Sequence, residues 1–153
     1  MSARALLAFG TALLLIAGNR VCVAQSLSVT PASTGPLTIS SAVAGQEPTG
    51  VSASGGTYTV GLKKNKGIGT ITAQLTAPLP AGTTLSITLA APGGGASSVG
   101  PVQLTTSPQA VVINLPNQST SFFNVAITYS FTATSAAGAL ALQTANVTLA
   151  LAP

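Results

Sequence analysis

The sequence predicts an all-β fold, an antiparallel β-sandwich of about seven to nine strands that follows a cleaved signal peptide. Apolar and polar residues alternate in many short segments, which is typical of strands with one face in a core. Clusters of Pro, Gly and Asn separate these segments at short intervals, and no segment has a convincing helical period. Short strands joined by such turns favour a sandwich, with a small β-barrel as the alternative.

The clearest alternation runs over residues 123–132. It places an apolar residue at every second position, namely Phe123, Val125, Ile127, Tyr129 and Phe131. A strand puts all of these side chains on one face, whereas a helix would scatter them around its circumference. The segment therefore predicts a strand with this face in the core. Phe122 breaks the phase of the pattern, so we expect it to be exposed.

Similar alternation predicts further strands. The longer runs are Tyr58, Val60 and Leu62; Ile71, Ala73 and Leu75; and Leu85, Ile87 and Leu89. The shorter runs are Leu27 and Val29; Leu37 and Ile39; Val102 and Leu104; and Val111, Ile113 and Leu115. Both tyrosines fall in phase with the apolar faces of their strands. We therefore expect them to lie in the core rather than to act as platforms for stacking sugars.

The end of the chain changes phase. Leu140 and Leu142 share one parity, whereas Val147, Leu149 and Leu151 share the other. A β-bulge or a short turn near residues 144–146 would reconcile the two runs. A short helix over residues 136–145 is the alternative, because Ala and Leu favour helices.

The first 24 residues have the organisation of a secretory signal peptide. Arg4 supplies the positive charge, residues 5–18 form an apolar core, and small residues precede a cleavage point after Ala24. The apolar core is shorter than the roughly 20 residues that a membrane-spanning helix needs, and every later apolar stretch is interrupted. We therefore expect residues 25–153 to form one secreted domain without a transmembrane segment. Its location would be extracellular or at the cell surface, with the periplasm as the alternative.

Cys22 raises a second interpretation of the leader, as the lipidation site of a lipoprotein. Bacterial lipoprotein signals usually carry a Leu and then small residues before the cysteine, whereas this chain has Asn19, Arg20 and Val21 there. The sequence therefore favours cleavage after Ala24. The mature domain then contains no cysteine and no disulfide.

Charge is almost absent from the predicted mature domain. Its only charged side chains are Glu47 and the lysines Lys63, Lys64 and Lys66. The high isoelectric point therefore reflects three lysines and the leader rather than a basic surface. A surface of Ser, Thr, Asn and Gln offers little electrostatic repulsion between copies, which favours self-association.

The composition argues against most enzymatic chemistry. The predicted mature domain has no His, Cys, Asp or Arg, so a Ser–His–Asp or Cys–His site cannot be built. A pair of catalytic carboxylates needs two acids, and only Glu47 is present. Zinc and transition-metal sites need His, Cys or several carboxylates. We therefore expect a protein that is not an enzyme and that has no cofactor and no metal.

The segment Lys63-Lys64-Asn65-Lys66-Gly67 is the only cluster of charge. It lies between two predicted strands, so we expect it at the tip or rim of a hairpin. A solubilising turn is one interpretation, because lysines discourage pairing between sheet edges. The other interpretation is a contact for an anionic partner, such as an acidic polysaccharide. The cluster lacks arginine and interleaved aromatic residues, which argues against a nucleic-acid partner.

The mature sequence resembles small secreted β-sandwich proteins of bacterial surfaces, such as fimbrial and coat subunits and immunoglobulin-like domains. The resemblance lies in its Thr/Ala/Gly-rich, weakly charged composition and in alternating final residues such as Asn146-Val147-Thr148-Leu149-Ala150-Leu151. It departs from many fimbrial subunits, which carry a cysteine pair. The resemblance implies a structural surface protein that associates with itself or with other surface proteins. An adhesin-like module that binds glycans is the alternative.

Overall fold

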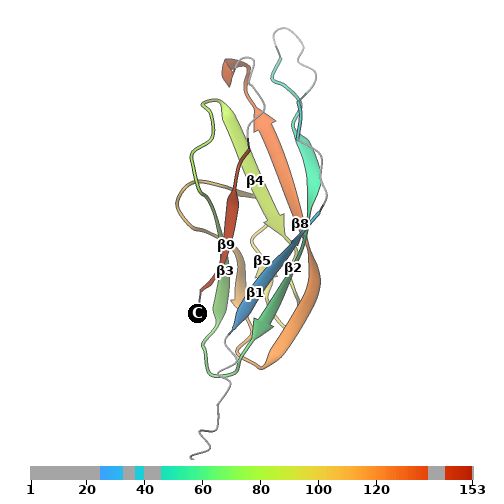
Figure 1. Cartoon of the computed structure of the whole chain (residues 1–153), viewed down its shortest axis with the longest axis vertical. Coiled ribbons are helices and arrows are strands. Elements are labelled where there is room, and N and C mark those ends of the chain that lie inside the picture. Colours follow the sequence, from blue (N-terminus) through green and yellow to red (C-terminus); the bar gives the residue numbers. More distant parts are fainter. Residues whose placement is uncertain (1–24, 33–36, 40–45, 138–143, 153) are drawn as a thin grey trace, which may run out of the picture.

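The computed structural model describes residues 25–32, 37–39, 46–137 and 144–152, which form an elongated molecule (Figure 1). The predicted signal peptide, which includes Cys22, and the pair Leu140 and Leu142 lie outside these residues. The strands are β1 (Ser26–Pro31), β2 (Val51–Leu62), β3 (Gly69–Leu75), β4 (Thr83–Leu89), β5 (Ser97–Ser98), β6 (Val102–Gln103), β7 (Gln109–Leu115), β8 (Thr120–Ala133) and β9 (Val147–Ala152). A 3₁₀ turn, η1 (Ser135–Ala137), follows β8.

The strands form two antiparallel sheets that face each other. The five-stranded sheet has the order β1-β2-β8-β4-β6, and the four-stranded sheet has the order β5-β7-β3-β9. This arrangement confirms the predicted all-β sandwich, because the strands divide into two sheets instead of closing into one barrel. No helix in the described part of the chain is long and apolar enough to cross a membrane.

The core lies between the two sheets and is built from the predicted alternation. The pattern is clearest in β3, where every second residue from Gly69 to Leu75 is buried. The buried hydrophobic residues are Tyr58, Val60, Leu62, Ile71, Ala73, Leu75, Leu85, Ile87, Leu89, Leu104, Val111, Val112, Leu115 and Ile127. Each fully buried aliphatic side chain contributes about 1.5–3 kcal/mol relative to an exposed one. The predicted inward faces of β2, β3 and β4 are therefore confirmed.

A β-bulge in β8 reverses the predicted roles of two phenylalanines. Tyr58 pairs with Val125 and Val60 pairs with Phe122, so two β8 residues oppose the single residue Thr59. One of them, Asn124, has a φ of 54°, a left-handed conformation that Asn tolerates better than most residues. The extra residue shifts the phase of the strand. Consequently Phe122 packs against the core and Phe123 is 69% exposed, opposite to the expectation.

The phase predicted for β7 is also wrong. Val111 and Val112 are both buried, whereas Ile113 is only partly buried. The pairing of β3 with β7 shifts register twice, between Gly69 and Ile71 and between Ile71 and Thr72. These irregularities turn neighbouring β7 residues towards the same core, which a strict alternation does not allow.

Two shorter predicted strands differ from expectation in other ways. Leu37 and Ile39 do not lie in a strand, although Leu37 packs against the core. Leu27 and Val29 do lie in β1, but Val29 is 44% exposed because β1 is the edge strand of its sheet. Residues 144–146 precede β9 without regular structure, in agreement with a break there.

Candidate functional site

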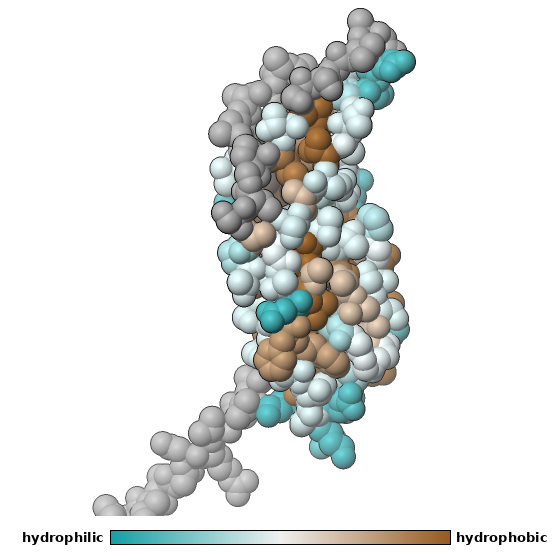
Figure 2. Space-filling view, turned by 90° about the vertical axis from the view of Figure 1, so that its right-hand side faces the viewer, coloured by the Kyte–Doolittle hydropathy of each residue, from teal (hydrophilic) through white to brown (hydrophobic). Residues whose placement is uncertain are grey.

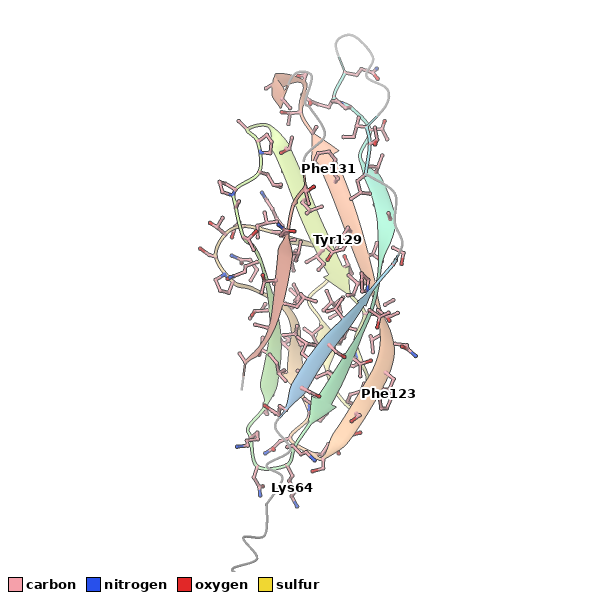
Figure 3. The ribbon with its side chains drawn as sticks, viewed as in Figure 1. Lys64, Phe123, Tyr129 and Phe131 are labelled. Carbon is pink, nitrogen blue, oxygen red and sulfur yellow. The ribbon has the colours of Figure 1, made fainter. Side chains whose placement is uncertain are left out.

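The lysine cluster connects the two sheets instead of closing a hairpin. It follows β2, which belongs to the five-stranded sheet, and precedes β3, which belongs to the four-stranded sheet. The expectation of a hairpin tip was therefore wrong, because alternation predicts strands but not the sheet to which each belongs. Figure 3 shows Lys64 at the lower end of the molecule, where it is exposed together with Lys66, while Lys63 is partly buried.

The backbone of the lysine loop is fixed by the loop between β7 and β8. The Lys64 N–H donates to the Ser119 Oγ at 3.3 Å, and the Lys66 N–H donates to the Asn117 Oδ1 at 3.2 Å. Asn65 turns the loop with a φ of 67°. The three ammonium groups are thus displayed from an anchored loop.

An open depression of about 270 Å³ lies beside this loop. Its lining residues are Ser26, Gly61, Leu62, Lys63, Ser119, Thr120 and Ser121. Hydroxyl groups and one ammonium group can hydrogen-bond to an anion or to sugar hydroxyls.

The side chains of Tyr58 and Tyr129 pack in or against the hydrophobic core. Tyr58 has no exposed surface, and its hydroxyl donates to the Ala90 carbonyl oxygen at 2.6 Å. Burial raises the pKa of Tyr58 to about 12 and also raises the pKa of Tyr129. Tyr58 is a buried core residue and Tyr129 packs against the core, which confirms the expected position of both side chains. Neither residue lines the depression beside the lysines.

Glu47, the only acidic side chain of the sequence, has a structural partner. The Ser135 N–H donates to its Oε2 at 2.7 Å, and the Ser135 hydroxyl donates to its Oε1 at 3.1 Å. These bonds attach the segment before β2 to the turn that follows β8. Sequence reasoning missed this role, because the two residues are far apart in the chain. The described residues contain no group of three or more His, Cys, Asp or Glu side chains that could hold a metal ion.

The strand edges are unequally protected, a feature that only the structure shows. The edge strands on one side of the sandwich, β5 and β6, have two residues each. The edge strands on the other side, β1 and β9, have six residues each and no charged residue. Very short strands, charges and Pro are the usual devices that prevent pairing between sheet edges. Strand length therefore protects the side formed by β5 and β6 but not the side formed by β1 and β9.

Pro31 protects β1. The Ala32 N–H donates to the Gly55 carbonyl oxygen, which places Ala32 among the residues that bond to β2. Bonding alternates along an antiparallel strand, so Leu27, Val29 and Pro31 face the free edge. Pro31 has no N–H to offer there. By contrast, β9 contains no Pro, and no strand in the described part of the chain pairs with its outer edge.

The surface beyond these features is weakly polar. Figure 2 shows one side of the molecule, where most residues are pale and the strongly hydrophilic residues lie mainly at the two ends. Brown residues form a band along the long axis between them. The exposed large hydrophobic residues among those described are Val29, Ile68, Val99 and Phe123. Figure 3 shows Phe123 on the outer side of β8.

Comparisons with family models, with curated proteins and with solved structures found no match to this chain.

Proposed function

We propose that this chain is a secreted, non-enzymatic structural protein of an extracellular surface, and that it works by associating with copies of itself. The observation that carries the proposal is the outer edge of β9, which has no charge, no Pro and no partner strand among the described residues. An edge of this kind is a template for pairing with another chain.

The composition supports the same proposal. The chain has one acidic side chain, and Glu47 is already engaged with Ser135. The three lysines are gathered in one loop at one end of the molecule, so the long sides of the sandwich carry little charge to keep copies apart. A leader with the features of a signal peptide supports secretion.

The test is the state of association of the secreted protein. Sedimentation over a wide concentration range, together with negative-stain microscopy, should reveal oligomers or fibres. A protein that remains monomeric at high concentration and forms no fibres contradicts the proposal.

A second candidate function is the binding of glycans or anionic surface polymers at the lysine loop. It is favoured by the depression beside Lys63, whose lining also offers hydroxyls from Ser119, Thr120 and Ser121. Binding of acidic and neutral polysaccharides should be compared between the native chain and a variant with Lys63, Lys64 and Lys66 replaced by Gln. The matched control replaces the same three lysines by Arg, which keeps the charge. Equal binding by all three proteins removes this candidate.

A further inference from the structure

The backbone groups of β9 that face the free edge can be identified from its pairing with β3. The Thr76 N–H donates to the Asn146 carbonyl oxygen at 3.1 Å, immediately before β9 begins. In an antiparallel pair, residues alternate between those that bond to the partner strand and those that face away from it. Asn146 bonds to the partner strand, so every second residue after it, namely Thr148, Ala150 and Ala152, also bonds to β3.

The other three β9 residues, Val147, Leu149 and Leu151, therefore direct their N–H and C=O groups towards the free edge. Their side chains are partly buried and pack against the core, so these residues stay ordered in a single copy. The free edge thus presents an evenly spaced row of donors and acceptors on a strand that the core holds in place.

We propose that β9 of one copy pairs antiparallel with β9 of a second copy, in the register that places Leu149 opposite Leu149. This inference rests on the proposed function and names its contact surface and its partner. The row of backbone N–H and C=O groups on the free edge is self-complementary in this register. Val147 of one copy then opposes Leu151 of the other, and each opposed pair exchanges two hydrogen bonds. Any other antiparallel register leaves at least one of these residues without an opposing one.

The side chains of β9 suit a second copy as the occupant. Neither β9 nor the neighbouring strand β3 contains a charged residue, so the junction brings no like charges together. On the outer face, Thr148 of one copy opposes Ala150 of the other, and these small side chains leave room for the approach. On the inner face, the leucines extend the core across the junction. The two four-stranded sheets become one continuous sheet.

Cysteine cross-linking tests this register. The full chain carrying Cys22→Ser provides a background without cysteine. Thr148→Cys and Ala150→Cys are made separately in this background and then mixed under mild oxidation. The mixture is expected to give at least ten times more disulfide-linked dimer than either variant alone, because the two positions face each other across a pair with close side chains.

The matched control for cross-linking is Thr72→Cys mixed with Ala150→Cys. Thr72 is the β3 partner of Ala150 on the same outer face, but it lies one strand away from the free edge. This mixture should give no more dimer than the single variants. Equal dimer yields from all mixtures overturn the proposed register.

A pair of substitutions at Leu149 tests the edge hydrogen bonds. Leu149→Pro removes the N–H that faces the free edge and leaves the bonds to β3 in place, whereas Leu149→Ala shortens the side chain but keeps the N–H. Circular dichroism should verify that both variants fold, and sedimentation should give a dissociation constant at least ten times higher for Leu149→Pro than for Leu149→Ala. Equal constants overturn edge pairing.

These outcomes separate the two proposals. If native chains associate, but the mixture of Thr148→Cys and Ala150→Cys gives no extra dimer and Leu149→Pro associates as tightly as Leu149→Ala, the β9 pairing is overturned and the proposed assembly function stands. Native chains that remain monomeric overturn both.

Discussion

The Tyr58 hydroxyl donates a hydrogen bond of 2.6 Å to the carbonyl oxygen of Ala90, the residue that follows β4. Tyr58 belongs to β2, and β8 lies between β2 and β4 in the sheet. The Ala90 N–H in turn donates to the Ala126 carbonyl oxygen in β8. The tyrosine therefore links two strands that are not neighbours. It also fixes the start of the segment after β4, which contains Gly93, Gly94 and Gly95 and is called the Gly-rich segment below.

Removal of this hydroxyl should weaken the fold. We expect Tyr58→Phe to lower the free energy of unfolding by about 1 kcal/mol, because the Ala90 carbonyl loses its partner. The matched control is Tyr129→Phe, since the Tyr129 hydroxyl makes no hydrogen bond among the described residues. Denaturant unfolding measures both, and an equal loss in the two variants contradicts a stabilising role for the Tyr58 bond.

The stability should depend on pH in the alkaline range. Burial raises the pKa of Tyr58 from 10.0 to about 12, so the folded chain keeps this proton over a range in which the unfolded chain releases it. The stability that the raised pKa of Tyr58 contributes to the folded chain is complete below pH 10 and is lost as the pH rises to about 12. At about 1.4 kcal/mol per pKa unit, the loss approaches 2–3 kcal/mol.

Tyr58→Phe isolates this effect, because it leaves Tyr129 and the lysines unchanged. Unfolding of both proteins at several pH values between 9 and 12 should show the native chain losing its advantage, and the order of stability should reverse towards the upper end. Parallel curves for the two proteins would show that Tyr58 does not control the alkaline transition.

Gly55 provides the space for the Tyr129 ring. Ser54 pairs with Thr128 and Gly56 pairs with Ile127, so Gly55 is the extra residue of a bulge in β2. A Cβ at Gly55 would fall onto the Tyr129 Cε2 and within 2.8 Å of the Ile127 Cγ2. We expect Gly55→Ala to destabilise the fold by about 1–3 kcal/mol through overpacking.

The control for Gly55→Ala is Gly69→Ala, which lies in β3. A Cβ at Gly69 would meet its nearest neighbours at 3.4 Å, an ordinary contact. Thermal unfolding should therefore show a fall in melting temperature for Gly55→Ala and little change for Gly69→Ala. Similar melting temperatures for both variants would mean that the ring has room to move away.

The sequence predicts the layers of this fold better than its connections. Alternation identifies the inward faces of β2, β3 and β4 because these faces keep a period of two. It does not reveal that Lys63–Lys66 joins two sheets, since pairing depends on residues distant in the chain. It also fails at Asn114 and Asn124, where a left-handed residue shifts the phase. An Asn inside an alternating segment was the available signal, because Asn adopts that conformation more readily than most residues.

The β9 edge could be predicted only in part. The alternating residues from Val147 to Leu151 indicate a strand, but its place at the end of a sheet follows from its single pairing with β3. Likewise, the protective role of Pro31 depends on the side of β1 that its missing N–H would face. Both conclusions need the register of each strand, which local composition does not contain.

The neighbouring residues Phe122 and Phe123 provide the sharpest test of the β8 bulge. The Phe122 ring packs against the core and approaches the Gly-rich segment, since a Cβ at Gly94 would lie 2.9 Å from its Cζ. Phe123 is 69% exposed. We expect Phe122→Ala to lower the free energy of unfolding by about 2 kcal/mol or more, and Phe123→Ala to change it by less than about 0.5 kcal/mol. Strict alternation along β8 predicts the opposite order, so the more damaging substitution, measured by denaturant unfolding, decides whether the bulge at Asn124 sets the phase of the strand.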